Sequence, residues 1–122
     1  MITFNVVHLQ GQEINCKKFH VGKFRHVSDV SGTTQIVRTK NTQTEVNEKL
    51  KVKVVYDIRW IDDCTYEISN RRIISEKNKT DKDEMNFILN VKILRSEGNK
   101  VFVSYTSNFS DDVYEGIMYK DD

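Results

Sequence analysis

Residues 50–60, with the sequence LKVKVVYDIRW, decide the fold class of this chain. Apolar side chains occupy every second position of the stretch, and charged residues fill most of the positions between them. Such alternation is typical of a β-strand with one buried face, because a helix of 3.6 residues per turn would scatter these side chains around its circumference. The alternating apolar residues are Leu50, Val52, Val54, Tyr56, Ile58 and Trp60.

Further alternating segments flank this stretch and raise the expected number of strands to about eight. The Gly98-Asn99 pair tolerates the positive φ of a tight primed turn, so the segments on either side of it are expected to form a hairpin. Residues 71–86 carry dense mixed charge instead, and they predict a long charged loop with room for one helical turn from Asp81. The other expected extended segments are 17–27, 33–40, 42–49, 64–70, 87–95, 100–109 and 113–120.

Short strands joined by turns predict an all-β fold whose sheet either closes on itself or packs as a sandwich. The run of consecutive hairpins favours closure, so we expect a single antiparallel eight-stranded barrel. The length of 122 residues suits one domain with one core.

The charge balance excludes several classes of partner. Lys and Arg together number 19 and Asp and Glu 18, which gives a net charge of +1. A dedicated nucleic-acid binder usually carries a clear basic excess, so neither nucleic acid nor an anionic membrane surface is expected as a partner. No apolar run approaches the roughly 18 residues of a membrane-spanning helix.

The first residues differ from the rest of the chain, because residues 1–16 contain no Lys or Arg. Two interpretations of residues 1–15 stay open. Thr3 to Leu9 would make an N-terminal strand, or Ile2 to Gln12 would be the remnant of a signal peptide. A signal remnant would place residues 16–122, the barrel domain, in the periplasm or outside the cell, whereas a true start at Met1 would leave the protein in the cytoplasm.

The two cysteines, Cys16 and Cys64, are too far apart in the sequence for a Cys-x-x-Cys metal or redox motif. In an exported protein they would form a disulfide, and closing a loop of about 50 residues would contribute roughly 3 to 4 kcal/mol. In the cytosol they would be two buried thiols.

Several motifs together carry a resemblance to a known group. They are Cys-x-x-Phe-x-x-Gly-x-Phe at 16–24, Arg38 followed by Gln43-x-Glu45, Trp-Ile-x-Asp-Cys-x-Tyr at 60–66, and Val-Lys-Ile-Leu at 91–94. With them the chain resembles small exported bacterial proteins of unknown function, for which the resemblance implies a lipocalin-like, calycin-type barrel. Gly22-Lys23-Phe24 is also similar to the Gly-x-Trp signature of the first lipocalin strand. Members often carry a topoisomerase IV label, which a short chain without an ATP-binding motif or a basic groove does not support.

An eight-stranded barrel is just wide enough to fill with its own side chains or to hold one small ligand. Two interpretations of Arg38 stay open. It could point into the barrel and anchor a ligand carboxylate with its guanidinium, or it could pair with Glu45 or Gln43 on the surface or across neighbouring strands. Aromatic side chains could line an apolar cavity or only build the core. The residues predicted to bind a ligand are Arg38, Glu45, Tyr56, Trp60, Phe102 and Tyr105.

Metal and catalytic sites find little support in the sequence. His20 and His26 would lie about 20 Å apart on a regular strand, too far for one metal ion. The acidic cluster of Asp81, Asp83 and Glu84 lacks the glycine of a calcium loop. Nucleophile-elbow, phosphate-loop and His-Glu-x-x-His motifs do not occur, so we expect a non-enzymatic protein without a cofactor.

The leading functional hypothesis is a lipocalin-like protein that binds a small apolar or amphipathic ligand in its barrel. The alternative is a structural or protein-interaction domain at the cell envelope, with a filled barrel and an unidentified partner. That alternative predicts an exposed apolar patch beside the loop 71–86, including Ile73, Ile74 or Met85.

Overall fold

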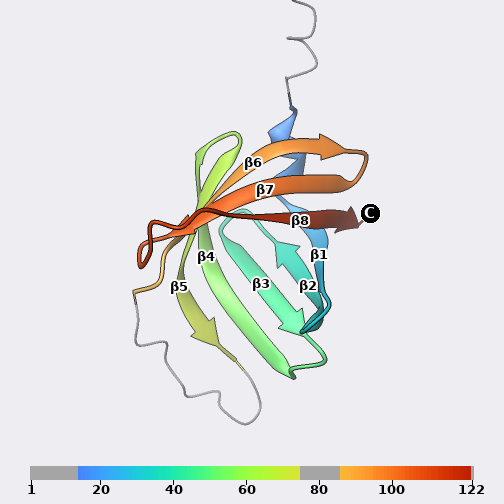
Figure 1. Cartoon of the computed structure of the whole chain (residues 1–122), viewed down its shortest axis with the longest axis vertical. Coiled ribbons are helices and arrows are strands. Elements are labelled where there is room, and N and C mark those ends of the chain that lie inside the picture. The colour runs from blue at the N-terminus through green and yellow to red at the C-terminus, as the bar shows by residue number, and fades with distance from the viewer. Residues whose placement is uncertain (1–13, 75–85, 122) are drawn as a thin grey trace, which may run out of the picture.

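In a computed structural model of the chain, which describes residues 14–74 and 86–121, the strands form a closed antiparallel barrel (Figure 1). Each strand pairs with the next along the chain, and the last strand returns to pair with the first. This confirms the all-β, eight-stranded antiparallel barrel, and the arrangement is compatible with a lipocalin-like fold. The elements are η2 (Cys16–Phe19), β1 (Gly22–Ser28), β2 (Gly32–Arg38), β3 (Thr42–Asn47), β4 (Val52–Asp62), β5 (Thr65–Ile73), β6 (Leu89–Glu97), β7 (Lys100–Ser107) and β8 (Tyr114–Asp121).

The up-and-down order places the connections alternately at the two ends of the barrel. The β2–β3, β4–β5 and β6–β7 turns lie at the end that η2 covers, and the β1–β2 and β3–β4 turns lie at the other. In Figure 1, β2, β3 and β4 run side by side, and β6, β7 and β8 cross above them. We call the end covered by η2 the closed end and the opposite one the open end.

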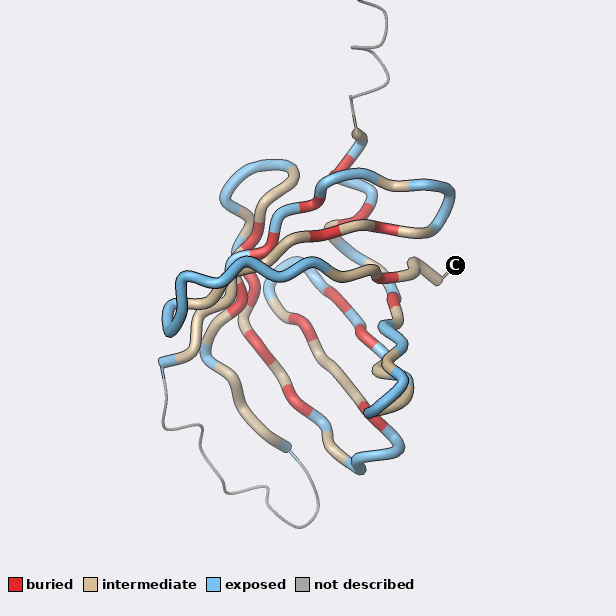
Figure 2. The backbone as a smooth tube through the Cα atoms, viewed as in Figure 1, coloured by how far each residue is buried: buried red, intermediate tan, exposed pale blue. Residues whose placement is uncertain are grey.

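The strand alternation predicted from the sequence appears as alternating burial along the tube in Figure 2. In β4, Val54, Tyr56 and Ile58 are buried while their neighbours are more exposed. The predicted hairpin at Gly98-Asn99 is also confirmed, because Glu97 pairs with Lys100 across this two-residue turn. Gly98 has φ +62°, as the first central residue of a type II′ turn requires.

Two predicted strand boundaries are wrong. The segment from Lys17 begins with the 3-10 helix η2 instead of a strand, because Cys16 and Phe19 turn inward together and both are buried. Leu50 is 55% exposed and lies in the β3–β4 turn, where its backbone N–H donates to Asn47 Oδ1 at 2.9 Å. The hydrogen bond to Asn47 therefore holds Leu50 in the turn, and β4 begins only at Val52, although the apolar alternation in the sequence starts at Leu50.

The long charged loop begins later than predicted, since the start of the 71–86 segment belongs to β5. The helical turn expected from Asp81 lies outside the described residues. The strand expected at Thr3 to Leu9 and the signal remnant expected at Ile2 to Gln12, the two interpretations of residues 1–15, also lie outside them.

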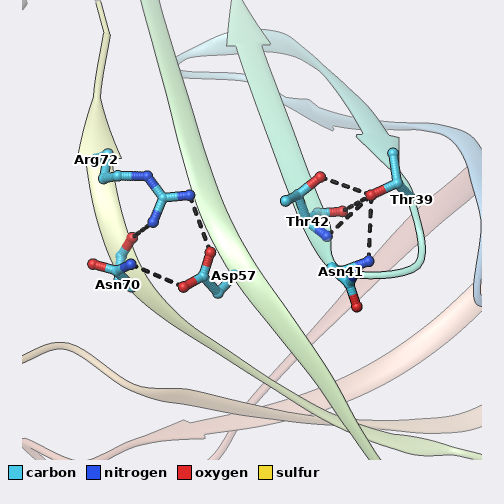
Figure 3. Close-up of polar contacts among 6 residues, drawn as sticks. All are labelled: Thr39, Asn41, Thr42, Asp57, Asn70 and Arg72. Carbon is cyan, nitrogen blue, oxygen red and sulfur yellow. Dashed lines mark hydrogen bonds and ion pairs between the residues drawn. The ribbon is translucent and has the colours of Figure 1, made fainter.

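An irregularity between β4 and β5 is stabilised on the outside of the barrel (Figure 3). Asn70 adopts φ +53°, a conformation that asparagine tolerates better than most residues. Its amide donates to Asp57 Oδ2 at 2.8 Å, while Arg72 bridges Asp57 Oδ1 at 3.0 Å and the Asn70 carbonyl at 2.9 Å. The hydrogen bonds that Asp57 accepts from Asn70 and Arg72 both lower its pKa, and the one from Asn70 has the larger effect.

Figure 3 also shows the β2–β3 turn, where Thr39 Oγ1 accepts hydrogen bonds from the backbone N–H groups of Asn41 and Thr42.

Candidate ligand-binding site

The closed end of the barrel is covered by η2 and held by a disulfide. Cys16, in η2, is bonded to Cys64, in the β4–β5 turn. Of the two alternatives left open for this pair, the disulfide is the one present, and it fastens the segment before β1 across the barrel end. Phe19, on the same turn of helix, is buried and lies in the core cluster with Phe24 of β1.

Beneath η2 lies Arg38, at the end of β2, and its side chain is only 1% exposed. Its guanidinium donates from Nη1 to the Phe19 carbonyl at 2.8 Å, from Nη2 to the Tyr66 hydroxyl at 3.0 Å and from Nε to Gln43 Oε1 at 3.0 Å. The carbon at its centre lies 4.6 Å from the ring centroids of both Phe24 and Tyr66. Neutral acceptors and aromatic faces thus compensate the buried charge, as cation–π contacts and hydrogen bonds can do.

Tyr66 completes this group from β5. Burial raises the pKa of its hydroxyl, although the nearby Arg38 charge acts in the opposite direction. The hydroxyl therefore stays neutral and accepts the hydrogen bond from Arg38. Tyr66 also contacts Trp60, whose ring lies 3.5 Å from that of His20 in a stacked arrangement.

On the side of this layer that faces away from η2, the barrel interior contains a cavity of about 260 Å³. Its wall is mostly aliphatic and aromatic, with Ile36, Ile68, Val91 and Val103 among its apolar residues. His26, which is solvent-exposed, lies on the same wall, so the cavity reaches toward the open end. Most binding cavities combine such an apolar wall with a few polar groups.

Two of the polar groups of the wall come from the start of β3. Gln43 and Glu45 are two positions apart and point to the same face of the strand, and both line the cavity. Gln43 Nε2 donates to Glu45 Oε2 at 2.8 Å. Burial is the main cause that raises the pKa of Glu45, against the opposing effects of Gln43, Arg38, His26 and Arg71.

A second hollow of about 660 Å³ lies beside the cavity, and His26, Val103, Gly116 and Ile117 line both. It follows the gap between the open-end halves of β1 and β8, which pair only over Lys23–Arg25 and Tyr119–Asp121. The strands are therefore not paired along their whole length at this seam.

The structure separates the six residues predicted to bind a ligand into three groups. Glu45, Tyr56 and Tyr105 line the cavity. Arg38 and Trp60 lie in the layer between the cavity and η2. There Arg38 donates a hydrogen bond to Gln43, which is one of the two partners considered for it in the sequence analysis. Phe102 points to the outside of β7 and packs under Arg95, whose guanidinium carbon lies 3.8 Å from the ring centroid.

Sequence reasoning missed several residues of the wall. Thr34 and His26 face each other across β1 and β2 at the open end, and Gly116 and Met118 contribute from β8. The alternation of β1 from Phe24 to His26 was a usable signal for the histidine. No signal in the sequence identified Gly116, since its role depends on the register between β7 and β8.

The described residues hold no cluster of three or more His, Cys, Asp or Glu side chains that could bind a metal ion. Within residues 14–74 and 86–121, no helix is long and apolar enough to cross a bilayer. Comparisons of the chain with protein-family models, curated proteins and solved structures gave no match.

Proposed function

We propose that this protein is a non-enzymatic, lipocalin-like carrier that binds one small amphipathic molecule inside its barrel. The observation that carries the proposal is the cavity of about 260 Å³ that lies between the Arg38 layer and the open end. A barrel built only as a scaffold would be expected to fill this space with side chains, because protein interiors are close-packed. The mixed wall, apolar with a few hydroxyl, amide and carboxyl groups, suits an amphipathic ligand.

The same proposal places the protein in an oxidising compartment, the periplasm or the outside of the cell. The Cys16–Cys64 disulfide supports this, since disulfides persist mainly in exported proteins. The resemblance to small exported bacterial proteins points to the same location.

Binding of indole, a neutral probe of suitable size, tests the proposal. We expect a titration followed by ¹H–¹⁵N NMR to shift the amide signals of Ile68, Val91 and Val103, which line the cavity. A Val103→Trp variant should abolish these shifts by filling the space. The matched control is Val37→Trp, which adds the same ring to a side chain that is 43% exposed on β2.

If neither indole nor a larger neutral aromatic compound shifts the cavity residues of the folded protein, ligand binding in the barrel is overturned. The alternative, a protein-interaction domain at the cell envelope, would then gain weight. Its support is that Ile74 is exposed just after β5, whereas Ile73 packs against the core and Met85 lies outside the described residues.

A further inference from the structure

Among the described residues that line the cavity, one has a carboxylate side chain and none is a lysine or arginine. That carboxylate belongs to Glu45 of β3. Arg38, which is buried next to η2, does not line the cavity and directs its donors to Phe19, Gln43 and Tyr66. An anionic ligand would therefore meet Glu45 without meeting the guanidinium.

Hydrogen bonds that run from Arg38 through Gln43 determine how the carboxylate of Glu45 is held. Arg38 can only donate, so the amide of Gln43 must turn its oxygen toward Arg38 and its NH₂ group toward Glu45. Glu45 consequently accepts at Oε2. This chain of hydrogen bonds, from Arg38 to Gln43 to Glu45, holds the carboxyl group in place at the wall of the cavity that Glu45 lines.

The surroundings do not fully compensate a negative charge at this position. Arg38, His26 and Arg71 all favour the carboxylate, yet burial outweighs them and the pKa of Glu45 stays above its ordinary value. A cation placed in the cavity would supply the missing compensation, because an opposite charge within about 4–6 Å favours the ionised form.

We propose that the ligand of this barrel is a small amphipathic amine, whose ammonium group binds the Glu45 carboxylate and whose apolar body packs among Ile36, Ile68 and Val91. This inference rests on the proposed function and names the chemical class of its ligand. An N⁺–H···O⁻ hydrogen bond of this kind is about twice as strong as a neutral one.

The volume limits the size of the amine. A cavity of about 150 Å³ holds one benzene molecule. The cavity of about 260 Å³ therefore has room for an aromatic ring with a short chain. Compounds with a long alkyl chain would have to extend into the seam between β1 and β8.

Three probes that share a ring and differ in the polar group test the inference: 2-phenylethylamine, 2-phenylethanol and 3-phenylpropionate. Their dissociation constants for the full, disulfide-bonded chain can be measured by NMR titration at neutral pH. We expect the amine to bind at least 10-fold more tightly than the alcohol, and the carboxylate to bind most weakly.

Glu45→Gln should reduce the affinity for the amine to that for the alcohol and leave alcohol binding unchanged, which also shows that the variant is folded. Glu48→Gln, the same change at an exposed position of the β3–β4 turn, should leave all three affinities unchanged. Equal affinities of the wild type for amine and alcohol, or tightest binding of the carboxylate, would overturn the amine inference and retain the proposed function. If none of the three probes nor indole binds, both fail.

Discussion

Arg38 and Tyr66 join β2 to β5 across the barrel interior, through a hydrogen bond of 3.0 Å from Nη2 to the phenol oxygen and a ring placed 4.6 Å from the guanidinium carbon. β3 and β4 separate these strands in the sheet, so the contact links parts of the wall that the sheet itself does not pair. With the bond from Arg38 to the Phe19 carbonyl, it also fastens η2 to the closed end.

Loss of this contact should destabilise the barrel. Arg38→Met leaves three buried acceptors without their donor and is expected to lower the free energy of unfolding by roughly 2–4 kcal/mol. Tyr66→Phe should cost about 1.5–3 kcal/mol, because it removes one hydrogen bond from a charged donor. Urea unfolding of both variants and of the double variant measures the coupling. If the two changes in the free energy of unfolding were additive, Arg38 and Tyr66 would not stabilise the barrel through their mutual contact.

The disulfide is expected to contribute stability mainly through the unfolded chain. Replacing Cys16 and Cys64 with alanine should lower the free energy of unfolding by about 3 to 4 kcal/mol, since the closed loop spans a sequence separation of 48. Chemical denaturation with and without a reductant provides the control: the reductant should destabilise the wild type and leave the variant unchanged. A wild type that is indifferent to reduction would contradict the expectation.

Much of the fold could be predicted from the sequence, because strand alternation is a local signal. Val54, Tyr56 and Ile58 are buried as their spacing implied, and the turn at Gly98 required only two residues to recognise. The ends of elements were less accurate. Leu50 continued the apolar pattern but lies in a turn, since the side chain of Asn47 accepts its backbone hydrogen bond.

The site was harder to predict because it depends on registers and on depth in the barrel. Strand alternation alone would place Arg38 inside the barrel. The sequence around it, however, does not reveal that it lies next to η2 and donates a hydrogen bond to the Phe19 carbonyl. Phe102 was expected in the cavity although it alternates with Val101 and Val103, and the structure turns it outward beside Arg95. Gly116 and Met118 could not be placed before the register between β7 and β8 was known.

The hydrogen-bonded group of Asp57, Asn70 and Arg72 on the outside of β4 and β5 predicts that the stability of the fold decreases at acid pH. The hydrogen bonds from Asn70 and Arg72 lower the pKa of Asp57 in the folded protein, so its ionised form stabilises the fold above the ordinary aspartate pKa. This contribution is lost as the pH falls through the lowered pKa. Asp57→Asn should therefore reduce stability at neutral pH, by up to about 1 kcal/mol because the group is exposed.

Thermal unfolding of the wild type and Asp57→Asn over an acid-to-neutral pH series checks this expectation. The difference between the two proteins should shrink toward zero at low pH. Asp111→Asn, in an exposed segment between β7 and β8, serves as the matched control. A difference that is constant with pH would mean that the charge of Asp57 does not act through these partners.

Glu45 should produce the opposite pH dependence. Its pKa is raised in the folded protein, chiefly by burial, so the native state holds a proton that the unfolded chain has already released. Between the ordinary glutamate pKa and the raised one, stability therefore falls as the pH rises, and above the raised pKa the cost of the buried charge is complete. Glu45→Gln carries no such charge and should be more stable than the wild type at neutral pH, but not in strong acid.

The comparison uses the difference in melting temperature between Glu45→Gln and the wild type, which cancels the contribution of Asp57 and other unchanged groups. This difference should be close to zero in acid, rise through the window above the ordinary glutamate pKa and then level off. Glu48→Gln should show no such rise. Saturating 2-phenylethylamine should stabilise the wild type more than the variant, because the ammonium group compensates the charge that otherwise destabilises the barrel. A Glu45→Gln variant that is less stable than the wild type at neutral pH would show that the protein itself already compensates this carboxylate, and the reason for a cationic ligand would disappear.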